Sequence, residues 1–195
     1  MTSAMLNLHI GIAIRVGFIL LIASPALGNS IQPPTAHTGA AGELDCRACH
    51  MDGAMNPDTG RLILKGLPDR YIPGQVYMLT VTLMYPHMER AGFQLSARFP
   101  DSPSKGKQAG ALVSQDDRVQ VVTDQTNEIQ YVQHSEAGMD LTGPAEVSWR
   151  FVWQAPDMFD AAVVFNASAN GANYDDSEFG DAVFLLTRHV AGVDP

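Results

Sequence analysis

The stretch VSWRFVW, residues 147–153, decides the fold class of this chain. Its large apolar side chains fall on one face of an extended backbone, and they are Val147, Trp149, Phe151 and Trp153. A period of two is typical of a β-strand that turns one face to a core. The sequence therefore predicts a half-buried strand at 147–153, with two tryptophans pointing inward.

The same period of two recurs on both sides of this strand. Further strands are predicted at residues 76–85, 92–99, 118–122, 129–134, 161–169 and 181–188. Turn pairs such as Pro73-Gly74 and Asn170-Gly171 separate them, and no strong helical pattern intervenes. Short strands with turns at this spacing predict an all-β fold, an antiparallel immunoglobulin-like β-sandwich.

Composition narrows the function classes. The chain has 195 residues, enough for one domain with a core, and its formal net charge is −9. Nucleic acid requires a basic face and anionic lipid attracts basic segments, so the charge argues against both partners. No hydrolase or nucleotide-binding motif is present in the sequence.

The N-terminus resembles a secretory signal. The apolar run VGFILLIA, residues 16–23, follows Arg15 and precedes Pro25 and small residues. We expect residues 1–28 to be a signal peptide and the mature chain to be exported, periplasmic or extracellular. An uncleaved N-terminal anchor is the alternative. No other stretch is long and apolar enough to span a membrane.

The stretch DCRACH, residues 45–50, holds the only two cysteines of the chain, followed at once by a histidine. C-x-x-C-H is the attachment motif of c-type haem. A lone disulfide and a zinc site with His37 remain as alternatives, although the zinc spacing is unusual. A redox dithiol would require a βαβ pattern, which is missing from the sequence.

The haem interpretation assigns a role to each residue of the motif. The thiols of Cys46 and Cys49 would each add to one vinyl group of a single haem c, and the spacing places both sulfurs along one haem edge. His50 would then be the proximal iron ligand. The loop-rich segment that carries the motif, residues 29–66, is too polar to enclose a haem alone, so we expect later residues to cover it.

The sixth iron ligand is open in the sequence. His134 is the first candidate because it ends a predicted strand, and the alternative is a hydrogen-bonded structural histidine. His87 is a weaker candidate in a predicted turn. The methionines are more typical of core packing, and the sixth position could also be empty or hold water.

Six stretches in a fixed order resemble a known family. The order is more specific than any one of them, and they are YIPGQVYMLTVTL (71–83), GFQLSA (92–97), YVQH (131–134), WRFVWQAP (149–156), VVFNASANG (163–171) and GD (180–181). Together they resemble the bacterial relatives of the Reeler domain, the β-sandwich named after reelin. Several bacterial members are similar to this chain in having a C-x-x-C-H stretch ahead of the sandwich.

The resemblance implies a division of the chain. Residues 29–66 would be the linker and haem-attachment segment, and residues 67–190 the Reeler-like sandwich. Animal Reeler domains generally carry disulfides, whereas this predicted sandwich has no cysteine.

Two functions follow as hypotheses. The first is an exported monohaem electron carrier, not an enzyme, that meets a redox partner with a basic docking patch; weak peroxidase-like activity is expected only if the sixth iron site is open. The second is an extracellular binding or adhesion module of Reeler type, in which haem is structural or sensory. The acidic run 173–181 offers oxygen donors for Ca²⁺, but a solvated loop is the simpler interpretation.

Overall fold

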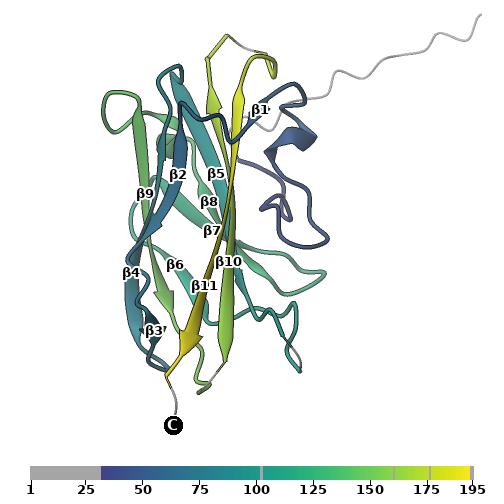
Figure 1. Ribbon diagram of the computed structural model, residues 1–195, viewed down its shortest axis with the longest axis vertical. Coiled ribbons are helices and arrows are strands. Elements are labelled where there is room, and N and C mark those ends of the chain that lie inside the picture. The colour runs from purple at the N-terminus through teal and green to yellow at the C-terminus, as the bar shows by residue number, and fades with distance from the viewer. Residues whose placement is uncertain (1–31, 102, 160, 176, 194–195) are drawn as a thin grey trace, which may run out of the picture.

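The computed structural model describes residues 32–101, 103–159, 161–175 and 177–193. The predicted signal peptide, residues 1–28, lies outside this part of the chain. The described residues form two β-sheets packed face to face (Figure 1). The predicted all-β antiparallel sandwich is confirmed.

The larger sheet has seven strands within the described residues. Its order is β1-β11-β10-β5-β8-β7, and β3 pairs with the end of β11. The strands are β1 (Ala54–Met55), β3 (Arg70–Tyr71), β5 (Arg90–Arg98), β7 (Val119–Thr123), β8 (Gln130–His134), β10 (Ala162–Ala172) and β11 (Ala182–Gly192). The long strands are antiparallel, and only the short β1 and β3 run parallel to β11.

The smaller sheet has the order β2-β4-β9-β6 and is antiparallel throughout. Its strands are β2 (Arg61–Lys65), β4 (Val76–Met84), β6 (Ala111–Ser114) and β9 (Glu146–Gln154). β2 lies ahead of residue 67, the expected first residue of the sandwich, and so does the short β1 of the larger sheet, while β11 ends at Gly192.

Helical structure is confined to two short 3₁₀ turns in the described part of the chain. They are η1 (Cys46–Ala48) and η2 (Ala137–Met139). No helix of the described residues has the length and apolar character needed to cross a membrane.

The core lies between the sheets and is built around β9. Its four alternating apolar side chains are fully buried, as the period of two predicted. Trp149 stacks on Phe93 of β5, with ring centroids 4.4 Å apart, and its indole N–H donates to the carbonyl of Gly138. Trp153 meets Phe165 of β10 edge to face at 5.0 Å. The aromatic contacts join the two sheets, and the carbonyl of Gly138 satisfies the buried indole donor of Trp149.

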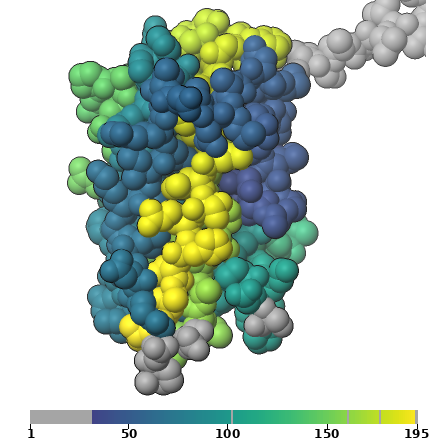
Figure 2. Space-filling model, viewed as in Figure 1, coloured from purple at the N-terminus to yellow at the C-terminus, as the bar shows by residue number. Residues whose placement is uncertain are grey.

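The outer face of the larger sheet is also covered, which the alternation along the strands does not predict. Its buried polar side chains are Gln94, Ser96, Gln133, Ser168 and Asn170. The N-terminal segment, residues 32–56, runs across this face outside β10 and β11 (Figures 1 and 2). Residues that the sequence predicted to be a linker are thus docked on the sheet.

Candidate functional site

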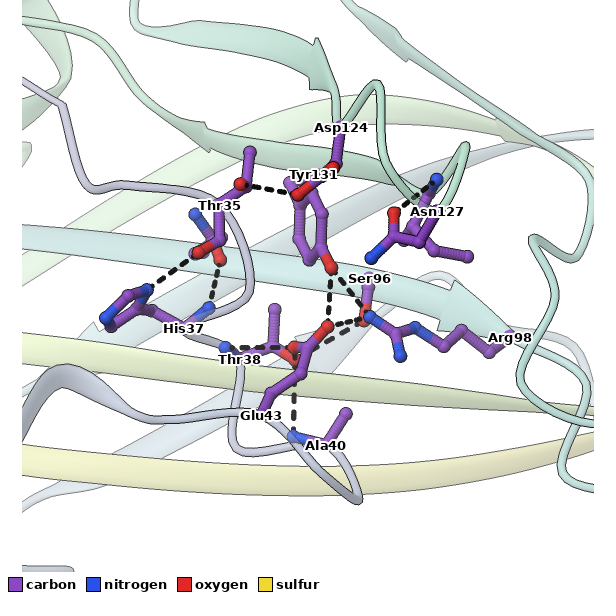
Figure 3. Close-up of polar contacts among 12 residues, drawn as sticks. Thr35, His37, Thr38, Ala40, Glu43, Ser96, Arg98, Asp124, Asn127 and Tyr131 are labelled. Carbon is purple, nitrogen blue, oxygen red and sulfur yellow. Dashed lines mark hydrogen bonds and ion pairs between the residues drawn. The ribbon is translucent and has the colours of Figure 1, made fainter.

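A buried polar cluster anchors the N-terminal segment ahead of the C-x-x-C-H stretch (Figure 3). The carboxylate of Glu43 accepts hydrogen bonds of 2.5 Å from the hydroxyls of Thr38 and Tyr131, and it forms an ion pair with Arg98. The side chains of Glu43 and Arg98 are only 5% and 13% exposed. A buried charge is tolerated where it is paired and hydrogen-bonded, so this cluster joins the segment firmly to β5 and β8.

Further contacts hold the segment on either side of the motif. The backbone N–H of His37 donates to the side chain of Gln94 over 2.7 Å, and Thr35 donates to Asp124 over 2.8 Å (Figure 3). Beyond the motif, β1 pairs with β11, and the N–H of Asn56 donates to the carbonyl of Val183. The position of the C-x-x-C-H turn is therefore determined from both ends.

The turn itself is a capped 3₁₀ helix. The side chain of Asp45 accepts from the backbone N–H of Arg47, and the N–H of His50 donates to the carbonyl of Cys46 over 2.9 Å. The backbone N–H of Cys46 donates to the hydroxyl of Ser168 on β10. Asx capping of this kind favours a tight turn, which brings His50 back onto the sheet.

The two cysteines are free thiols in different surroundings. Cys49 is exposed, whereas Cys46 is partly covered by the sheet. Burial raises the pKa of the Cys46 thiol to about 11, against a smaller opposite effect of Ser168. Cys49 is thus the accessible thiol of the pair.

His50 lies against a buried carboxylate. Its Nδ1 is 2.6 Å from Oδ2 of Asp181, the residue directly before β11. The Asp181 side chain is fully buried, whereas 29% of the His50 side chain is exposed. A carboxylate accepts hydrogen bonds only, so Nδ1 of the imidazole is the donor. In the neutral ring Nε2 then carries the lone pair that could bind a metal, and the amide nitrogen of Asn170 lies 3.4 Å from it.

Asn170 completes this arrangement from β10. Its amide donates to Oδ2 of Asp181 over 3.0 Å and lies 3.2 Å from Nδ1 of His50. The amide oxygen is buried and has no hydrogen-bond partner among the described residues. The amide oxygen of Asn170 is therefore a buried acceptor beside His50 that receives no hydrogen bond from the described residues.

Hydrogen bonding keeps Asp181 ionised. Burial raises the pKa of its carboxyl, but the hydrogen bonds from His50, Asn170 and the backbone N–H of Asn173 together outweigh burial and hold the pKa below its ordinary value. The carboxylate beside His50 is thus a fixed negative charge.

His134 is buried at the end of β8, where the strand leaves β5. Its Nδ1 lies 3.0 Å from the backbone nitrogen and 3.1 Å from the carbonyl oxygen of Phe93, so the ring takes the place of a neighbouring backbone. No partner is recorded for its Nε2 among the described residues, and burial lowers the pKa of the imidazole. The geometry fits both a structural histidine and a ligand with a free Nε2.

The two histidines lie on neighbouring parts of one sheet face. The ring of His134 covers Gly92 of β5, and Gly92 is paired with Asn170 of β10. Asn170 in turn contacts His50. A row His50–Asn170–Gly92–His134 therefore crosses the outer face of the larger sheet.

The remaining histidine candidates lie elsewhere. His87 is exposed in the turn after β4 and packs its ring edge to face with Tyr85. His37 is used by the docked segment, with Nδ1 2.8 Å from the carbonyl oxygen of Thr35. No group of three or more His, Cys, Asp or Glu side chains is placed to hold a metal ion within the described residues.

The segments around the motif expose apolar side chains. Those near the C-x-x-C-H turn and on the β10–β11 loop are Leu44, Met51, Met55, Tyr174 and Phe179. The loop is tied to the motif segment, since the N–H of Gly180 donates to Asp52. A haem needs apolar cover, two accessible thiols and a histidine with a free Nε2. This region offers the cover, Cys49 and His50, while Cys46 would have to move partly out of its buried position.

Sequence reasoning missed the residues that hold His50. Asp181 belongs to the acidic run 173–181, for which the simpler expectation is a solvated loop, but its carboxylate is bound to His50, Asn170 and the backbone. Asn170 belongs to a predicted turn pair, which gives no hint of a contact with His50. The signal available in the sequence was their place at the facing ends of two predicted strands, which an antiparallel hairpin brings together.

Comparisons with known proteins point to the fold. No family model and no curated protein matches the chain. Solved structures that are similar include the Reelin-N domain of F-spondin, at 20% identity over 76% of this chain and 97% of that chain, with a TM-score of 0.49. The human F-spondin reeler domain is 20% identical over 72% and 91% of the two chains, with a TM-score of 0.47. A cohesin module from Clostridium perfringens is 10% identical over 70% and 98%, also at 0.47.

F-spondin Reeler domains are thus among the structures similar to this chain.

Proposed function

We propose that this chain is an exported c-type haem protein that carries electrons. One haem c would be bound covalently by Cys46 and Cys49, with His50 as the proximal iron ligand. The observation that carries the proposal is the 2.6 Å contact between Nδ1 of His50 and the buried carboxylate of Asp181. Metal-bound histidines commonly donate their second ring N–H to such a carboxylate.

A disulfide followed by chance by a histidine would not require this contact. A buried carboxylate is costly unless it is well paired, and here its partners include the one histidine of the motif. Asp181 and Asn170, which contact His50, lie more than a hundred residues further along the chain. They therefore support the haem proposal independently of the C-x-x-C-H motif.

The distal ligand in this proposal is His134. It lies on the same sheet face as His50. The tautomer in which Nδ1 donates to the carbonyl of Phe93 would leave Nε2 for iron, and it would give up the hydrogen bond that Nδ1 accepts from the N–H of Phe93. His87 is the weaker candidate, because it is exposed in a turn away from the row His50–Asn170–Gly92–His134.

When bound, the haem supplies a one-electron iron centre. The chain would contribute His50 and His134 as iron ligands, the apolar cover and the charge of Asp181, and these would together set the reduction potential. The net charge of −9 favours a weak, salt-sensitive encounter with a redox partner that has a basic docking patch. The N-terminal signal supports export to the compartment where c-type haem is attached.

The test is covalent haem itself. The full chain is expressed in a bacterium with c-type cytochrome maturation, and the denatured polypeptide is analysed as its pyridine haemochrome. We expect a c-type spectrum that stays with the wild-type polypeptide and is lost when both cysteines are replaced by serine. Folded, colourless wild-type protein under the same conditions would refute haem attachment.

A second candidate function rests on a different surface. Met78 of β4 and Val113 of β6 both pair with Val152 of β9, so an apolar row crosses the outer face of the smaller sheet. Met78 and Val113 are about half exposed, and so is Val76 beside them. Exposed apolar patches often mark interaction sites. This row favours an extracellular binding module in which haem is structural or sensory.

The two proposed functions predict different experimental results. An electron carrier must show a reversible one-electron couple and lose it with the haem. A binding module must be retained on purified cell-envelope material even as the double cysteine-to-serine variant, and must lose this retention on Met78→Lys.

A further inference from the structure

We propose that Asp181 is a positioning residue for the iron-bound histidine, and that through its hydrogen bond to His50 it lowers the reduction potential of the centre. The inference rests on the proposed function, because it requires a haem at His50. It concerns a residue outside the C-x-x-C-H motif, contributed by the far end of the chain.

Three hydrogen bonds hold the carboxylate of Asp181. Oδ2 accepts from Nδ1 of His50 at 2.6 Å and from Asn170 at 3.0 Å, and Oδ1 accepts from the backbone N–H of Asn173 at 3.2 Å. Its side chain has no exposed surface. Asp181 therefore cannot turn away from the imidazole without leaving two donors unsatisfied.

A β-ladder sets the position of these groups. Asp181 directly precedes β11, whose first residue, Ala182, is paired with Gly171 of β10. Asn170 is the neighbour of Gly171 and is paired with Val183. Both side chains that contact His50 thus come from one antiparallel hairpin. A site built on paired strands is more rigid than one built on a loop.

The loop after His50 is shaped to keep this contact. A Cβ at Gly53 would lie 3.1 Å from the carbonyl oxygen of His50 and 3.2 Å from that of Asp181. A side chain at this position would make unusually tight contacts, so glycine eases the close passage of the chain between the histidine and the start of β11. The approach of His50 to Asp181 is thus supported by the backbone on both sides.

The expected consequence is electronic. A negative acceptor at Nδ1 draws the ring proton toward it and makes Nε2 a more basic ligand. A more basic ligand and a nearby negative charge both stabilise the oxidised iron over the reduced iron. In this interior, where Asp181 is shielded from water, the effect is larger than that of an exposed charge.

Asp52 provides a matched control. It is two residues from His50, it is exposed, and its carboxylate accepts from the N–H of Gly180 without contacting the imidazole. Asp52→Asn also removes one negative charge two residues from His50. It leaves the hydrogen bond between His50 and Asp181 intact. Any difference between Asp181→Asn and Asp52→Asn is therefore due to contact and burial.

The experiment measures the midpoint potential of the full-length holoprotein as wild type, Asp181→Asn and Asp52→Asn. For Asp181→Asn we expect the equilibrium constant for reduction to rise at least tenfold, which is about 59 mV for one electron. Asp52→Asn should shift it by much less. Equal potentials in all three proteins, or equal shifts in the two variants, would overturn the inference.

A second measurement needs no variant and covers the case in which Asp181→Asn does not fold. In reduced, isotope-labelled wild type, the Nδ1 proton of His50 should be visible by NMR, far downfield and slow to exchange with water. A rapidly exchanging proton would overturn the inference. If the wild type carries no covalent haem at all, the proposed function fails first, and the haemochrome spectrum shows this before any potential is measured.

Discussion

Cε1 of His134 lies 2.5 Å from the point at which a Cβ of residue 92 would stand, so the imidazole occupies the space of a missing side chain. Gly92 is the position that lets the ring lie flat on β5 and reach the backbone of Phe93. The sequence pattern gives no reason for a glycine inside this strand, and the structure supplies one: close approach of a ring.

Replacing Gly92 with alanine tests this relationship. The added methyl group would collide with the ring, and overpacking of this kind typically costs about 1–3 kcal/mol. We expect Gly92→Ala to lower the free energy of unfolding by that amount in a denaturant titration. Gly143→Ala is the control, because the nearest atom to a Cβ there is 4.0 Å away. Equal stabilities of the two variants would contradict the account of His134.

Glu43→Ala should release the docked segment. Arg98 would lose its buried carboxylate, and breaking a buried pair by removing one partner costs about 3–5 kcal/mol. We expect trypsin to cleave the native protein after Arg47 at least tenfold faster than wild type, because cleavage follows the population of the open form. Glu89→Ala, an exposed glutamate, should leave the rate unchanged. An unaltered rate in Glu43→Ala would show that other contacts hold the segment.

Because His134 is buried, we expect the free energy of unfolding of the haem-free chain to depend on pH. Its pKa in the folded state is lowered, first by burial and against the opposing bond of Phe93, from an unfolded value near 6.5. The unfolded state therefore binds more protons at acid pH. The contribution of neutral His134 to the free energy of unfolding is fully present above pH of about 6.5. It is lost as the pH falls through the pKa of the folded state, by up to about 1.4 kcal/mol per pH unit.

Denaturant unfolding between pH 7.5 and 5 measures this slope. His134→Asn, whose side-chain oxygen can still accept from Phe93, should flatten it. His87→Asn, a substitution of an exposed histidine, is the matched control. A slope that survives His134→Asn would assign the proton uptake to another group.

The two thiols should differ in reactivity before haem is attached. With a pKa of about 11, the Cys46 thiol is about 100-fold less ionised at neutral pH than an ordinary cysteine. In the single-cysteine variants Cys46→Ser and Cys49→Ser, alkylation followed by mass spectrometry should show fast modification of Cys49 and slow modification of Cys46. Comparable rates would mean that the turn opens readily in solution.

The core was predictable because burial along its strands is periodic. The inward positions of β9 follow from a period of two, and the same argument locates Leu79, Val81 and Leu83 on β4. The same period places Gln94 and Ser96 on the opposite face of β5, which alternation alone would leave to solvent, yet both are buried. Periodicity along one strand cannot reveal that a distant segment covers its other face.

The C-x-x-C-H motif of the candidate site was predictable from the sequence. The residues that hold His50 in place were not. C-x-x-C-H is contiguous, so its chemistry can be inferred without a fold. The contact of His50 with Asp181 joins residues that are 131 positions apart. Such a contact depends on which strands become neighbours and on their register. Alternating residue types do not encode either of these long-range choices.

The order of the chain has a consequence for assembly. The surface that receives Cys46 and His50 is built by β10 and β11, which are the last strands to be made. About 110 residues separate the motif from β10, so during export the motif enters the new compartment before the two strands that cover it. Until β10 and β11 follow, these strands bury neither thiol. Haem attachment at that stage would not need to undo the later burial of Cys46.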